Sequence, residues 1–215
     1  MQVIEYPSFA RNKSKRIKNL AMAFLISGVL LSFCAVHLVF LWIPASFGYA
    51  LFLKCLQLNV NPSQGQRGED KTAQVLSVLG DEYILFRNFN PGQQNGDIDF
   101  ILLGPFGALV LEQKTLSVPL VCIGDTWKVQ VSPTYWKPIK SYSRQLKRNQ
   151  SVVTRILGIP CLGAIVLNNS ISLDVSNPTV PIIRRRDLLA FIYDLPSMNG
   201  DVKHLCSRMQ QSVAA

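Results

Sequence analysis

The chain has 215 residues, a formal net charge of +9 and 48% hydrophobic residues. This length suits one medium-sized domain with an appended segment, and the positive mean hydropathy is unusual for a soluble enzyme. The five cysteines show no disulfide-scaffold spacing, and with two histidines a zinc site is not expected. The sequence contains no P-loop, dinucleotide-binding fingerprint, G-x-S-x-G motif or internal repeat.

The N-terminal end combines a basic tail with a long apolar run. Residues 1–18 are polar and rich in lysine and arginine, and no charged residue occurs from Leu20 to Ile43. A helix of about 20 apolar residues crosses a bilayer. We therefore expect residues 19–58 to form a transmembrane helix with a juxtamembrane segment, and the chain to contact the membrane through residues 20–43 as a single-pass protein.

Two arguments about the side of the membrane conflict. The basic tail predicts a cytoplasmic N-terminus, which would place everything after a single span outside the cytoplasm. The cysteine pattern suits a reducing compartment instead. The side of the domain stays open, with the cytosol favoured.

The rest of the chain predicts an α/β fold, in which a mixed β-sheet is flanked by helices and preceded by the transmembrane helix. Residues 59–66 contain Pro62 and Gly65 and are expected to form a linker, so the domain spans residues 66–211. Strands are expected at 83–89, 96–104, 107–115, 118–123, 127–131, 161–167 and 180–183. Helices are expected at 68–79, 138–157, 187–193 and 200–211.

The stretch from Gly96 to Thr115 carries the main chemical signal. Two apolar runs flank a Gly-Pro-Phe-Gly turn, which predicts a β-hairpin. A turn centred on Pro105-Phe106 places Asp99 directly opposite Glu112, whereas a three-residue turn with a bulge at Gly107 would shift the register by one residue and send Glu112 to the other face. Lys114 shares the face of Glu112 because side chains alternate along a strand. Two carboxylates so close repel each other, and Mg²⁺ between them would remove that conflict.

These residues resemble a known nuclease signature. Asp99, the hairpin and Glu112-Gln113-Lys114 are similar to the Asp…(Asp/Glu)-x-Lys signature of the PD-(D/E)xK superfamily. The wider context, from Gly68-Glu69 to the helix with Gln145, resembles the nuclease-related domain, NERD. The resemblance implies a restriction-endonuclease-like fold and an enzyme that cuts phosphodiester bonds with Mg²⁺, or with Mn²⁺ in its place.

The resemblance also implies roles for single residues. Asp99, Glu112, Lys114 and Gln145 would be catalytic, and Asp99, Glu112, Glu69 and the backbone carbonyl of Gln113 would hold the metal. Glu69 is equally explained as a first-turn glutamate favoured by the helix dipole, and Gln145 as a helix-edge amide. Asp97 is either a second ligand or a loop acid at the strand entrance.

Six cations in and before the long helix indicate a phosphate-binding surface for nucleic acid, with DNA expected. They are Lys137, Lys140, Arg144, Lys147, Arg148 and Arg155. The plain alternative is a solvated helix face, and the arginine triplet at 184–186 either extends the surface or solvates a loop. The sequence thus predicts a membrane-anchored, metal-dependent nuclease. The alternatives are an inactive NERD-fold module that binds nucleic acid or a protein at the membrane, and a basic surface that contacts lipid headgroups.

Overall fold

The computed structural model describes residues 1–6, 19–20, 22–24, 26–27, 49, 64–92, 96–198 and 201–214. The chain divides into two compact units. One unit joins Met1–Tyr6 to Arg67–Ala215, and the other is Pro7–Gln66. The first unit holds every strand discussed below and every helix except for residues 64–66, the first three of the helix of residues 64–76.

A six-stranded mixed sheet forms the centre of the first unit, as predicted. The middle strands form an antiparallel meander, and the outer pairs β1–β2, β4–β8 and β8–β10 are parallel. In spatial order the strands are β1 (Gln2–Glu5), β2 (Ile84–Phe89), β3 (Ile98–Gly104), β4 (Gly107–Lys114), β8 (Leu162–Leu167) and β10 (Ile182–Arg184).

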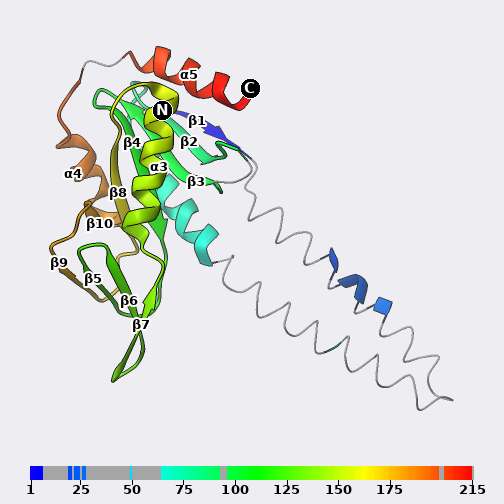
Figure 1. The fold of residues 1–215 in the computed structure, drawn as a ribbon. Coiled ribbons are helices and arrows are strands. Elements are labelled where there is room, and N and C mark those ends of the chain that lie inside the picture. Colours follow the sequence, from blue (N-terminus) through cyan, green and yellow to red (C-terminus); the bar gives the residue numbers. More distant parts are fainter. Residues whose placement is uncertain are drawn as a thin grey trace. The chain divides into compact units, whose positions relative to one another are not determined.

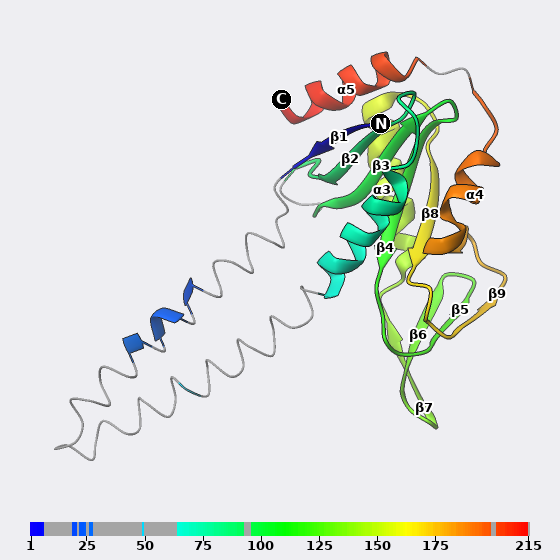
Figure 2. The same ribbon diagram turned by 180° about the vertical axis from the view of Figure 1, so that it is seen from behind.

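Helices cover both faces of this sheet. Figure 1 shows α3 (Tyr142–Leu157) lying across one face, where it and α5 (Val202–Ala214) pack on apolar side chains of β2, β3 and β4. Figure 2 shows the helix of residues 64–76 and α4 (Leu188–Tyr193) on the opposite face. Burial on both sides explains why β3 and β4 read as continuous apolar runs instead of alternating ones.

A second, four-stranded sheet accompanies the first. Its order is β7 (Tyr135–Ile139), β6 (Thr126–Ser132), β5 (Leu120–Ile123) and β9 (Leu173–Ser176). The hairpin of β5 and β6 was expected from the Gly124-Asp125 turn. Strands β7 and β9 were not expected.

Strand β7 corrects the predicted start of the long helix at residue 138. Pro138 lies in β7, an edge strand, where its missing N–H disturbs no further ladder. The helix begins only at Tyr142, because the Ser141 side chain caps it by accepting the backbone N–H of Arg144 at 3.2 Å. Lys140 therefore lies before the helix and not on its face.

The N-terminal residues also contribute a strand that their polar composition did not indicate. Residues 2–5 pair with β2 in parallel and form one edge of the sheet. The amino group of Met1 donates to the Asp81 carboxylate at 2.9 Å, beside the start of β2.

The prediction of a membrane-spanning helix is wrong for the described residues. None of the helices among the described residues is long and apolar enough to cross a bilayer. Most of residues 20–43, and most of the expected juxtamembrane segment and linker, lie outside the described residues. The assignment as a single-pass membrane protein is therefore withdrawn.

Close contact between the helix of residues 64–76 and β4 generates a first prediction. A Cβ on Gly68 would lie 1.8 Å from Thr115 Oγ1, whereas a Cβ on Gly65 would meet no atom of the described residues within 4 Å. We expect Gly68→Ala to destabilise the domain by about 1–3 kcal/mol through overpacking.

Gly65→Ala, one turn earlier in the same helix, is the matched control. It should leave stability unchanged or raise it by up to about 1 kcal/mol, because alanine favours the helix. Urea denaturation followed by circular dichroism measures both variants. Equal stabilities for the two variants would contradict the close packing of Gly68.

Candidate active site on the β3–β4 hairpin

The β3–β4 hairpin has the register that its turn predicted. Gly104 pairs with Gly107, and the same register continued to the far end of the ladder places Asp99 opposite Glu112. The backbone N–H of Gln113 donates to Asp99 Oδ2 at 2.8 Å, which fixes the Asp99 carboxylate against β4. Two carboxylates from neighbouring strands therefore meet at one end of the hairpin.

Glu112 is fully buried, and three side chains donate hydrogen bonds to its carboxylate. Lys114 Nζ lies 2.6 Å and Gln145 Nε2 2.5 Å from Oε1, and Asn149 Nδ2 lies 3.0 Å from Oε2. Gln145 and Asn149 are one turn apart on α3, so they present their amides on the same side of the helix. Sequence analysis identified Gln145 but not Asn149; the signal that could have found Asn149 is its spacing of one helical turn after Gln145.

Asp99 sits in an environment that opposes its ionisation. Burial and then the carboxylate of Glu112 raise its pKa well above the ordinary value. Lys114 and the Gln113 N–H act in the opposite direction but do not reverse the shift. Glu69 also raises the pKa of Asp99, so its carboxylate is close enough to act on the same site.

Lys114 carries the opposing positive charge. Burial alone would lower its pKa, but the carboxylates of Glu112 and Asp99 outweigh burial and the pKa is raised. Its ammonium also lies 5.2 Å from the centre of the Tyr142 ring, a cation–π contact that holds it beside α3. Lys114 is therefore a protonated, positioned cation and not a base.

Gln113 points to the opposite face of the sheet. Thr72 Oγ1 donates to its side-chain oxygen at 2.5 Å, and Arg185 Nε donates to Thr72 Oγ1 at 2.9 Å. Arg185 also donates to the backbone carbonyl of Gly68 at 3.3 Å. Arg185 is only 8% exposed. It ties the helix of residues 64–76 to the back of β4, so the expectation that it solvates a loop or adds to a phosphate surface is wrong.

The donors available to a metal are all oxygens. The carboxylates of Glu112 and Glu69 both act electrostatically on Asp99, and hard cations such as Mg²⁺ prefer carboxylate oxygens. Within residues 64–92, 96–198 and the other described parts, however, no group of three or more His, Cys, Asp and Glu is arranged to hold a metal ion. Asp97 accepts a hydrogen bond from Asn90 Nδ2 at 3.1 Å, as a loop acid would.

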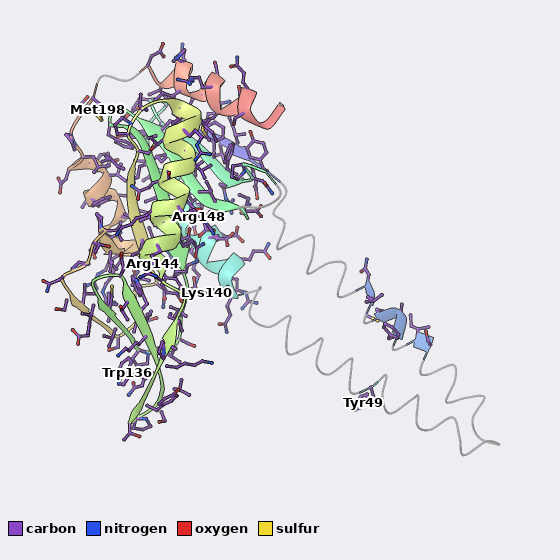
Figure 3. All side chains as sticks on the ribbon, in the orientation of Figure 1. Tyr49, Trp136, Lys140, Arg144, Arg148 and Met198 are labelled. Carbon is purple, nitrogen blue, oxygen red and sulfur yellow. The ribbon has the colours of Figure 1, made fainter. Side chains whose placement is uncertain are left out.

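A pocket of about 750 Å³ opens beside this cluster, at the N-terminal end of α3. Lys140, Arg144 and Arg148 line it, together with Gln145, whose amide reaches Glu112. Figure 3 shows these three cations following one another along α3 and the segment that leads into it. The pocket and the carboxylate cluster thus share one side chain.

The other three predicted cations occupy different surroundings. Lys137 is exposed on β7, and Arg155 is exposed in the last turn of α3. Lys147 Nζ lies 3.0 Å from Oδ2 of Asp125, so it forms an ion pair. The six residues therefore do not form one continuous helix face, because the helix starts later than predicted.

The raised pKa of Asp99 predicts how stability depends on pH. A folded-state pKa above the unfolded value means that ionisation of Asp99 opposes folding. Asp99→Asn keeps an oxygen for the Gln113 N–H but cannot ionise. In EDTA we expect this variant to be more stable than the wild type at pH 8. The difference should shrink as pH falls toward the ordinary aspartate value of about 3.9, which urea denaturation across pH measures.

Asp125→Asn is the control, because its effect on the free energy of unfolding should have the opposite sign. Hydrogen bonds from Thr179 and Lys147 lower the pKa of Asp125, so its charge favours folding at neutral pH and this contribution is lost in acid. The variant should be less stable than the wild type at pH 7 and converge with it at low pH. An Asp99→Asn protein that is less stable than the wild type at pH 8 would contradict the environment described for Asp99.

Comparison with known proteins gives a match to one protein family. No curated protein matches the chain, and no solved structure matches it. Residues 64–168 match the family model of NERD, described as the nuclease-related domain. This segment runs from the helix before the sheet through β8 and contains the whole carboxylate cluster with Lys114, Gln145 and Asn149. The match supports the assignment of residues 64–168 to the nuclease-related domain family.

Proposed function

We propose that this protein is a divalent-metal-dependent nuclease that hydrolyses phosphodiester bonds of nucleic acid, with DNA as the expected substrate. One observation carries the proposal. Asp99 and Glu112 meet on one face of the β3–β4 hairpin with the ammonium of Lys114 2.6 Å from Glu112. The match of residues 64–168 to the nuclease-related domain supports the same class of chemistry.

Carboxylate oxygens are the donors that Mg²⁺, or Mn²⁺ in its place, prefers. Asp99 and Glu112 would hold the ion, with Glu69 and the backbone carbonyl of Gln113 as further ligands. Burial, and then repulsion from the carboxylate of Glu112, raise the pKa of Asp99, and a divalent cation relieves such repulsion. When bound, the ion would polarise the scissile phosphate and lower the pKa of a bound water.

The chain's own groups would orient and stabilise the reacting phosphate. Lys114 stays protonated because its pKa is raised, so its ammonium would stabilise negative charge that develops on phosphate. Gln145 and Asn149 hold the Glu112 carboxylate in one orientation. Gln145 also lines the pocket that contains Lys140, Arg144 and Arg148. A phosphate backbone bound by these cations would therefore pass close to Glu112.

A second candidate is a NERD-fold module that binds nucleic acid without cutting it. The observation in its favour is that both oxygens of Glu112 already accept hydrogen bonds, and Lys114 balances its charge. A metal would have to compete with these donors. The two candidates differ in cleavage and not in binding.

Replacement of single site residues tests the nuclease proposal. Asp99→Asn and Lys114→Met should each lower cleavage by about a hundredfold or more, while affinity for nucleic acid changes little. Groups that act mainly in the transition state affect turnover more than binding. The assay uses labelled single- and double-stranded DNA and RNA with Mg²⁺, Mn²⁺ or EDTA.

Lys203→Met is the matched control for Lys114→Met, because Lys203 is an exposed lysine on α5. It should cleave at the wild-type rate. Circular dichroism of each variant separates lost chemistry from lost folding. If the wild type binds nucleic acid but never cuts it with either metal, the binding-module candidate replaces the nuclease; if it does neither, both candidates are wrong.

A further inference from the structure

The pocket at the start of α3 has a cationic lining. Lys140, Arg144 and Arg148 line it, and α3 begins beside it with no acid in the first turn. The positive end of the helix dipole adds to the cationic field there. The acid that lines the pocket, Asp125, accepts hydrogen bonds from Lys147 and from the Thr179 hydroxyl, so its charge is already balanced.

The pocket is larger than a phosphate group requires. Its volume of about 750 Å³ lies in the range of pockets that hold whole small ligands, about 300–1,000 Å³. Part of its wall is apolar: Pro138 is exposed on β7, Ile139 is half-buried, and Trp127 lies behind them. An anion with an attached flat apolar group, such as a nucleotide with its base, matches this lining better than phosphate alone.

Strand β7 extends the apolar wall away from the carboxylate cluster. Trp136 and Pro138 lie two residues apart on β7, so their side chains share one face of the strand. Figure 3 shows Trp136 on the hairpin of β6 and β7, beyond Lys140, Arg144 and Arg148. Cations beside an aromatic platform are the combination that binds unpaired nucleic acid, because bases stack on the ring while phosphates contact the cations.

We propose that the pocket and β7 bind single-stranded nucleic acid, with one nucleotide in the pocket and a neighbouring base on Trp136. A paired base is stacked inside its duplex and cannot enter such a pocket without being unstacked. Gln145 links the pocket to Glu112, so the bound strand leads to the carboxylate cluster. The inference rests on the proposed function, since it makes this pocket the substrate subsite of that same cluster.

Binding of the full chain in EDTA tests the inference without any cleavage. Fluorescence anisotropy compares a labelled 12-nucleotide single strand, the same strand with abasic positions, and its duplex, at one salt concentration. We expect the intact single strand to bind about tenfold more tightly than either alternative. Trp136→Ala should weaken single-strand binding about tenfold and leave duplex binding unchanged, in line with the usual contribution of base stacking.

Charge variants complete the test. Arg144→Glu should weaken single-strand binding and reduce its salt dependence, since fewer phosphate contacts release fewer counterions. Lys203→Glu makes the same kind of charge change on α5 and should have no effect. Circular dichroism confirms that each variant is folded.

Equal affinity for single strand and duplex, together with no effect of Trp136→Ala, would overturn the inference. Vesicles of anionic lipid that displace the oligonucleotide and bind more tightly would also overturn it, because the pocket would then be a lipid-headgroup site. If the protein cleaves nucleic acid but shows no preference for single strands, only the proposed single-strand subsite is wrong. If it prefers single strands but does not cleave them with any metal, only the proposed nuclease activity is wrong.

Discussion

The structure depends on a carboxylate buried in the middle of a sheet. Glu112 has no exposure to solvent, and removal of an ionised carboxylate from water is costly unless hydrogen bonds and an opposing charge replace the water. Lys114 from the same strand and two amides from α3 supply these partners. Gln145 and Asn149 therefore help to hold α3 against the sheet, together with the apolar contacts of the helix.

The same cluster is not arranged for maximal stability. Asp99 lies opposite Glu112 and near Glu69, so its ionisation is opposed by burial and by two like charges. Local arrangements that oppose folding persist mainly where function needs them. On the opposite face of the sheet, Thr72 of the helix of residues 64–76 donates to Gln113 of β4, and Arg185 donates to Thr72 and to the Gly68 carbonyl. These contacts support β4 behind the carboxylates that repel each other.

The strands and their register were largely predictable because local chemistry determines them. The Gly-Pro-Phe-Gly turn sets the pairing of β3 with β4, and period-two alternation then places Lys114 on the face of Glu112. Strand β7 was missed because Lys137 and Lys140 fit a helical spacing, whereas the Ser141 cap starts the helix after them. Strand β1 was missed because it has only four residues, and its two apolar residues lie in a segment that is otherwise polar and basic.

Contacts between distant segments could not be predicted from local patterns. Arg185 appeared as one of three surface arginines, yet it lies buried against Thr72, 113 residues earlier in the chain. The pocket at α3 likewise arises from β6, β7 and α3 together. The match to the nuclease-related domain family indicates a class of chemistry, and the site proposed for that chemistry is the Glu112 cluster with the adjoining pocket.

An anomalous difference map tests the central claim most directly. The crystal would contain the protein with Mn²⁺ and a short oligonucleotide. The account predicts one strong peak between the carboxylates of Asp99 and Glu112, with Lys114 moved from Glu112 toward a phosphate. A fully bound oligonucleotide with no peak there, and with Lys114 still paired to Glu112, would contradict it.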